Sequence, residues 1–244
     1  GPWSVKCGFQ ASLTSPPAPG YVHAERSFDT RFEGGRMAHQ QAHDEKLDAL
    51  LAAAARVFAK RGYHETSMRD LARESGVSLS GLYYYVKSKD ELLFLIQDRS
   101  FAAVLSSMEE ATAGIENPVE RLARFIDNHL DYFASHMAEM KVLSHESGAL
   151  SGEMLSQVNA KKREYTRVLM DILADVERTC GAAHVNRRIA TYTLFGMMNW
   201  IYNWYDPLGD LSVEVLSQSI CRLFLGGYVG MPVSESVMPH MTAG

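Results

Sequence analysis

The side chains best suited to bind a partner gather in one stretch, TSMRDLARESGVSLSGLYYYVKSK, which runs from Thr66 to Lys89. It combines several hydroxyl groups, three consecutive tyrosines and two lysines, Lys87 and Lys89. Hydroxyl, phenol and ammonium groups bind phosphate oxygens, and small or apolar side chains contact the edges of bases. These residue types therefore favour contact with nucleic acid.

The same stretch predicts the two short helices that would position these side chains. Gly76 can adopt a left-handed turn conformation, and Ser78 can cap the helix that follows. Two helices joined in this way form a helix-turn-helix, whose second helix lies in the major groove of DNA. The alternative is that the tyrosines are core aromatics and the lysines a solvated face. Because successive helical positions lie about 100° apart, three consecutive tyrosines cannot all face one core.

The charge is unevenly divided along the chain. The 244 residues carry 24 Lys+Arg and 29 Asp+Glu, a net charge of −5, which argues against a protein that binds polyanions over its whole surface. Residues 44–89 hold 8 basic and 6 acidic side chains (+2), whereas residues 90–244 hold 12 and 20 (−8). A short basic segment on an acidic body is consistent with DNA contact confined to that segment.

The periodicity predicts an all-α fold with about nine helices, because apolar residues recur with a helical period from Asp44 onward. We expect a three-helix domain with the helix-turn-helix at 44–89 and a longer helical domain at 90–230. Residues 1–43 are expected to be a disordered leader, with Met37 as a candidate native start, and residues 231–244 a flexible tail. Helix starts are marked by capping residues at Ser67 (or Thr66), Ser78, Ser88 and Asn117, and later helices are expected at 137–147, 186–205 and 212–228.

Residues 46–96 resemble the DNA-binding domain of the TetR family of bacterial transcriptional regulators. The similarity includes LLAAAARVFAKRGY, the TSMRDLA helix, the GVS turn, the LYYY recognition helix and KSKDELL. It implies that the second and third helices contact double-stranded DNA, some residues through bases and others through phosphates. The residues implied are Thr66, Ser67, Arg69, Leu79, Ser80, Gly81, Tyr83, Tyr84, Tyr85 and Lys89. One tyrosine could instead pack on the first helix, and Arg69 could instead pair with Asp70 or Glu65.

The family resemblance implies that the C-terminal domain binds a ligand and forms a homodimer. Helices 186–205 and 212–228 would pair with their copies in a second subunit, so that a two-fold dimer matches a palindromic operator. The alternative is that the last helix packs inside its own subunit. The expected seam consists of Leu216, Ile220, Leu223, Phe224 and Gly227.

The segment FGMMNWIYNWYDPLGDLS (195–212) resembles TetR-type regulators of fatty-acid and acyl-CoA catabolism, which implies a small hydrophobic effector, with an acyl-CoA as its specific form. Cations at 161–163, 167, 187 and 188 could hold coenzyme A phosphates, or they could form a solvated face. His129 lies in an apolar stripe, where it is either a hydrogen-bonded core residue or a ligand contact. The expected pocket consists of His129, Phe133, Met140, Tyr165, Arg167, Asn199, Trp200, Asn203 and Trp204.

Other classes of protein find little support in the sequence. No nucleophile–base pair or phosphate-binding glycine loop indicates an enzyme, and no ligand spacing indicates a metal or other cofactor. No apolar run approaches the length of a membrane span, and three scattered cysteines suit a reducing bacterial cytoplasm, close to the nucleoid. We therefore expect a repressor released from its operator by an effector. The alternatives are an efflux or catabolic repressor induced by an aromatic compound, and a protein of this fold that acts through a protein partner.

Overall fold

The computed structural model describes residues 30–146, 148–180 and 185–228, with side chains from residue 40. These ranges form nine α-helices and one short 3-10 helix without strands, so the all-α prediction is confirmed. Residues 1–42 and 43–244 are separate units, and the sites described below lie in the second. The helices are α1 (Thr30–Arg61), α2 (Met68–Glu74), α3 (Leu79–Tyr85), α4 (Lys89–Thr112), α5 (Pro118–Ser135), α6 (Met137–His145), α7 (Gly152–Cys180), α8 (Arg187–Asn199), η1 (Trp200–Asn203) and α9 (Val213–Tyr228).

The start of α1 corrects the expected leader. The helix begins at Thr30, so residues 30–43 are helical rather than disordered. This part has no apolar period to mark it, and it contains two glycines, but it contains no proline that would interrupt a helix. The remainder of the expected leader, residues 1–29, and the expected tail, 231–244, lie outside the described residues.

The N-terminal domain has the caps that the sequence indicates. The α1 helix ends at Gly62, whose φ of 83° is a left-handed conformation suited to glycine. Ser67 caps α2 in a capping box with Asp70, and Ser78 caps α3 by accepting from the backbone N–H of Gly81. Ser88 accepts from the N–H of Glu91 as expected, but the Glu91 carboxylate accepts from the N–H of Lys87 rather than from that of Ser88. Helices α1 to α3 pack around a core that includes Leu50, Phe58, Leu71 and Leu82.

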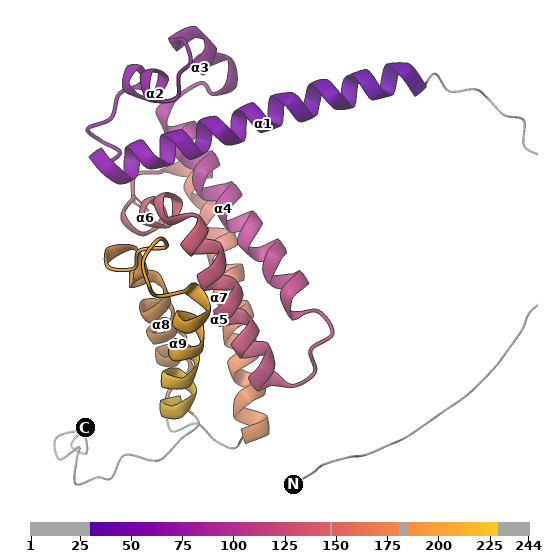
Figure 1. Cartoon of the computed structure of the whole chain (residues 1–244), viewed down its shortest axis with the longest axis vertical. Helices are drawn as coiled ribbons and strands as arrows, with labels where there is room; N and C mark the ends of the chain where they lie inside the picture. Colours follow the sequence, from indigo (N-terminus) through magenta and orange to yellow (C-terminus); the bar gives the residue numbers. More distant parts are fainter. Residues whose placement is uncertain (1–29, 147, 181–184, 229–244) are drawn as a thin grey trace, which may run out of the picture. The chain divides into compact units, whose positions relative to one another are not determined.

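The C-terminal domain is built around α5, which lies against α4, α7 and α9. Asn117 caps this helix by accepting two backbone N–H groups, and proline occupies its first position. Its apolar stripe is buried in a second core that also contains side chains from α4, α7, α8 and α9. Figure 1 shows these helices gathered beside α5. Within the described ranges no helix combines the length and apolar character needed to cross a membrane.

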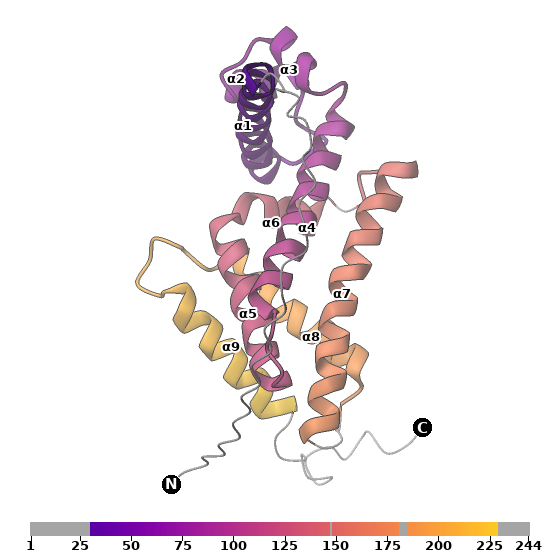
Figure 2. The same cartoon turned by 90° about the vertical axis from the view of Figure 1, so that its right-hand side faces the viewer.

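The short helix α6 lies between the two cores, below α2 and α3 and above α8 and α9 (Figure 2). Met140 belongs to the C-terminal core, whereas Val142, two residues later, belongs to the N-terminal core. Gln97 of α4 donates a hydrogen bond to the Glu146 carbonyl at the end of α6, over 3.3 Å. The α6 helix therefore contacts both domains at once.

Candidate functional site

The exposed face of α3 carries the side chains expected to meet DNA. Tyr84 is 68% exposed, Tyr83 and Ser80 are also exposed, and Tyr85 is half-buried. The Tyr85 ring lies 4.9 Å from the ring of His43, which belongs to α1. Tyr85 thus packs on the first helix. The Tyr84 ring lies 5.9 Å from the same histidine but is largely exposed, and Tyr83 is exposed as well.

Two of the expected phosphate contacts are structural instead. Thr66 is 1% exposed, and its hydroxyl donates to the Gly62 carbonyl over 2.7 Å. The Lys89 ammonium donates to the carbonyls of Tyr63 (2.9 Å) and Thr66 (3.0 Å), and it lies 4.3 Å from the centre of the Tyr63 ring. Both groups thus have partners inside the protein, which favours a structural role over the phosphate contact that the sequence suggested. Lys87 is exposed and remains available.

The polar face of α2 leaves one arginine unpaired. Asp70 accepts from Ser67 and pairs with Arg73 at 2.6 Å and Arg61 at 3.6 Å. The hydrogen bond from Ser67, with the neighbouring Arg73, lowers the pKa of Asp70 to about 2. Arg69 is exposed, and in the part of the chain that the structure describes its guanidinium has no ion-pair partner. Arg69 is therefore free to reach DNA.

The first turn of α3 presents little bulk. Leu79 is half-buried against the N-terminal core, and Gly81 donates its backbone N–H to the Ser78 hydroxyl over 3.0 Å. A Cβ at Gly81 would lie 3.1 Å from that hydroxyl, so a larger residue would crowd the cap. The groups that this turn exposes are consequently small, and one of them, the Ser80 hydroxyl, lies 3.0 Å from the Ser78 hydroxyl.

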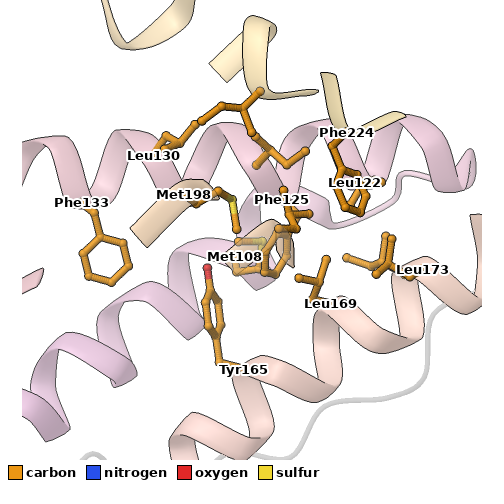
Figure 3. Close-up of a cluster of buried hydrophobic side chains, with 14 of the residues drawn as sticks. Met108, Leu122, Phe125, Leu130, Phe133, Tyr165, Leu169, Leu173, Met198 and Phe224 are labelled. Atoms are coloured by element: carbon orange, nitrogen blue, oxygen red, sulfur yellow. The ribbon is translucent and has the colours of Figure 1, made fainter. Parts of the chain in front are cut away.

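The C-terminal domain contains a cavity of about 380 Å³, a size within the roughly 300–1,000 Å³ typical of small-molecule sites. Figure 3 shows Tyr165 pointing from α7 toward α5, and Phe133 projecting from α5. The structure brings five of the predicted pocket residues to this cavity: His129, Phe133, Met140, Tyr165 and Asn199. Lys162, which the sequence offered as a candidate phosphate contact, also lines the cavity. The sequence analysis missed the other lining residues, which are Phe101, Leu143, Ser144, Thr166, Tyr192, Phe195 and Gly196.

The sequence left two roles open for His129, a hydrogen-bonded core residue or a ligand contact. In the structure it is a hydrogen-bonded core residue that also lines the cavity. It is 1% exposed, and its Nδ1 and Nε2 lie 2.9 Å from the Tyr165 hydroxyl and 3.0 Å from Asn199 Oδ1. Burial lowers the pKa of His129 to about 3, so the imidazole is neutral at physiological pH. Burial also raises the pKa of the Tyr165 phenol, which keeps its proton.

Four predicted pocket residues do not line the cavity. Arg167, Trp200, Asn203 and Trp204 are all exposed. Arg167 lies on the exposed side of α7, and the other three follow the point at Asn199 where the chain leaves the regular helix and continues as η1. Lys162 is the one side chain of the cationic cluster that reaches the cavity among the described residues. Two other members of that cluster are occupied elsewhere, since Lys161 pairs with Asp98 at 2.6 Å and Arg187 pairs with Glu177.

The expected dimer seam on α9 is partly buried and partly exposed. Leu216, Ile220 and Phe224 are buried in the core of their own subunit, so the prediction that they meet a second subunit is wrong. Their spacing of four residues places them on one side of the helix, against α5. Leu223, which is 70% exposed, and Gly227 are exposed, although each lies only about 20° from Leu216 around the helix axis. Val215 of α9 is exposed too, as are Ile189 and Tyr192 of α8 and Trp200 of η1.

An all-α chain with an exposed helix-turn-helix at one end and a cavity in a second helical domain has the architecture of a ligand-responsive DNA-binding regulator. Two family models match it, one for bacterial regulatory proteins of the tetR family over residues 50–96, and one for a tetracyclin repressor-like C-terminal domain over residues 116–228. The chain belongs to the TetR family of transcriptional regulators.

Individual relatives include both activators and repressors. The chain is 24% identical to the transcriptional activator FasR of Mycolicibacterium smegmatis, over 87% of this chain and 97% of the relative. It is 28% identical to the transcriptional repressor KstR2 of the same organism, over 75% and 90%. A crystal structure of AibR in complex with isovaleryl coenzyme A and operator DNA superposes with a TM-score of 0.66 at 27% identity, covering 73% of this chain and 97% of that one. These relatives are regulators rather than enzymes, as the sequence indicated.

Proposed function

We propose that this regulator is a repressor that binds a palindromic DNA operator as a homodimer in the bacterial cytoplasm and is released by an acyl-CoA. The observation that carries the proposal is the position of α6. Met140, Leu143 and Ser144 of this helix line the cavity. At its other side, Glu146 Oε1 accepts the backbone N–H of Tyr63, just beyond α1, over 3.0 Å. A ligand that displaces α6 would therefore act directly on the DNA-binding domain.

The DNA contacts that we propose come from side chains that are exposed on α3 and beside it. Ser80, Tyr83 and Tyr84 are exposed on α3, and Arg69 and Lys87 flank them with two positive charges. Tyrosine and serine hydroxyls can donate to phosphates, while arginine can form bidentate hydrogen bonds to a phosphate or to the edge of a guanine. Each cation that neutralises a phosphate would release counterions, which makes binding depend on salt.

The effector proposal is supported by the chemistry of the cavity. Phe101, Phe133 and Phe195 make it largely apolar, and Lys162 is an exposed cation where the cavity meets solvent. An acyl group would occupy the apolar part, and coenzyme A phosphates could bind the lysine. The AibR complex shows that one relative of this fold binds such a ligand. The aromatic walls also favour a second candidate, an uncharged aromatic or other hydrophobic compound.

Release follows if the effector binds better to a conformation in which the two recognition helices no longer match the operator. The shift is limited by the difference in the effector's affinity for the two conformations, commonly about 1–3 kcal/mol. The homodimer would use the exposed outer faces of α8 and α9, and its half-sites would lie about one helical turn (~34 Å) apart. A dimer of this kind contacts both half-sites with identical surfaces.

The proposal is tested by fluorescence anisotropy with a labelled DNA fragment from the region upstream of the gene. We expect specific binding at moderate salt, a loss of at least tenfold in Arg69→Gln and in Tyr84→Ala, and release by octanoyl-CoA. The control is Arg163→Gln, which removes an exposed arginine from α7 and should leave DNA affinity unchanged. Light scattering on each variant checks that the dimer is retained. Equal losses in Arg163→Gln and Arg69→Gln would contradict the assignment of the DNA surface.

A further inference from the structure

A hydrogen-bonded chain of three side chains crosses the wall of the cavity. Tyr165 of α7, His129 of α5 and Asn199 of α8 are joined through the two ring nitrogens of the histidine, over 2.9 and 3.0 Å. The rings of His129 and Tyr165 are stacked, with centroids 5.9 Å apart. The imidazole is almost completely buried, so its position is set by the packing of three helices.

The donors and acceptors of Tyr165, His129 and Asn199 determine the direction of each hydrogen bond between them. Asn199 Oδ1 can only accept, so the histidine must carry its proton on Nε2 and donate it to that oxygen. A neutral imidazole then has a lone pair on Nδ1, which accepts the proton of the Tyr165 hydroxyl. Because the pKa of His129 is lowered to about 3, the ring stays neutral and this pattern persists at physiological pH.

The orientation of Asn199 follows from this direction. With its oxygen held by His129, the amide must present its Nδ2, which carries two N–H donors, on the opposite side. Asn199 lines the cavity and is half-buried, and among the described residues its Nδ2 has no hydrogen-bond partner.

We infer that the cavity recognises a neutral carbonyl oxygen on the apolar body of its effector, through a hydrogen bond donated by Asn199 Nδ2. The inference rests on the proposed function only in taking this cavity as the effector site. A ligand donor, such as an amine, would face N–H groups here and would lose its own hydrogen bonds to water without replacement. A carbonyl has the required acceptor, and it can belong to a thioester or to a ketone.

The test compares pairs of probes that differ by the carbonyl alone. Octanoyl-CoA is compared with its S-octyl thioether by calorimetry, and 2-nonanone with nonane by thermal shift, using the full chain. We expect each carbonyl compound to bind about tenfold more tightly than its partner, which corresponds to about 1.4 kcal/mol. A preference in the first pair alone identifies the carbonyl as a thioester, and one in the second pair alone identifies a ketone.

Two variants of Asn199 test the donor itself. Asn199→Asp keeps an oxygen for His129 and replaces the N–H donors with a second oxygen, so the preference for the carbonyl should vanish or reverse. Asn199→Leu should abolish the preference without reversing it, and the melting temperature of each ligand-free variant shows that it is folded. The control is Asn203→Asp, because Asn203 is exposed, lies outside the cavity and donates only to the Trp200 carbonyl.

Operator release, measured in the same samples, separates this inference from the proposed function. Equal binding within both pairs, or no binding by any probe, overturns the carbonyl subsite even if octanoyl-CoA or another compound releases the operator. A tenfold preference that Asn199→Asp removes upholds the subsite, and if no probe then releases DNA, only the proposed effector role fails. A preference that Asn199→Asp leaves intact also overturns the subsite.

Discussion

Replacing Lys89 by methionine tests whether this residue acts on the fold or on DNA. The ammonium group donates to the carbonyls of Tyr63, His64 and Thr66, at 2.9, 3.4 and 3.0 Å, and lies over the Tyr63 ring. These carbonyls belong to the loop between α1 and α2, so Lys89 of α4 fastens that loop to the rest of the domain. Methionine fills similar space but cannot donate.

The expected loss of stability is about 2 kcal/mol. A hydrogen bond to a charged group contributes roughly 1.5–3 kcal/mol, and we take the lower part of this range because Lys89 is half-exposed and one ammonium serves all three carbonyls. Equilibrium urea unfolding measures the change. Lys87→Met is the matched control, because Lys87 is exposed and its replacement should change stability by no more than about 0.5 kcal/mol.

The same two variants are predicted to behave in the opposite way toward DNA. If Lys87 neutralises one phosphate in each half-site, Lys87→Met should reduce the slope of log affinity against log salt concentration by about 1.8, because the homodimer loses two contacts, while Lys89→Met should leave the slope unchanged. Unchanged stability in Lys89→Met together with a reduced salt slope would refute the structural role and restore the phosphate contact that the sequence suggested.

Three further predictions follow from buried and exposed groups. Because the pKa of His129 falls from 6.5 to about 3 on folding, the unfolded chain binds more protons below pH 6.5, and stability must fall as the pH drops toward 3. Between pH 7 and pH 5 the wild type should lose about 2 kcal/mol more than His129→Gln in urea unfolding, and parallel pH profiles would contradict a neutral buried imidazole. Glu146→Ala removes the acceptor of the Tyr63 N–H. In anisotropy titrations the operator affinity without octanoyl-CoA, divided by the affinity with it, should then fall at least fivefold. An unchanged ratio would show that the Glu146–Tyr63 hydrogen bond does not carry the coupling. Leu223→Glu should convert the dimer to a monomer in light scattering, whereas Leu208→Glu, at a position that is 96% exposed outside the helices, should not; a dimeric Leu223→Glu would place the interface elsewhere.

The helix boundaries could be predicted from the sequence because local chemistry determines them. Ser78 and Asn117 satisfy free N–H groups in the first turn of the helix that follows each of them, and Gly62 ends α1 in a left-handed conformation. Those effects act over three or four residues, so they are visible in the sequence itself. The early start of α1 was missed because a helix without an apolar period leaves no such pattern.

The sequence could not show in the same way which residues of a helix are buried, or which partners a polar side chain finds. Leu216 and Leu223 are both leucines on α9, and only the position of α5 decides that the first is buried and the second exposed. Lys89 looked like a phosphate ligand because the carbonyls that it binds lie 23 to 26 residues earlier in the chain. Phe101 of α4 joins the cavity for a similar reason, since the packing of α4 against α7 brings it there.

The measurement that tests the central account most directly is a DNase footprint of the wild-type protein on the DNA upstream of its gene, with and without octanoyl-CoA. The account predicts protection of two inverted half-sites about one helical turn (~34 Å) apart, and loss of that protection as the acyl-CoA is added. Parallel footprints with Tyr84→Ala should show no protection at the concentration that saturates the wild type. Specific protection that persists at saturating acyl-CoA would contradict the effector, and the absence of any specific protection at moderate salt would contradict the repressor itself.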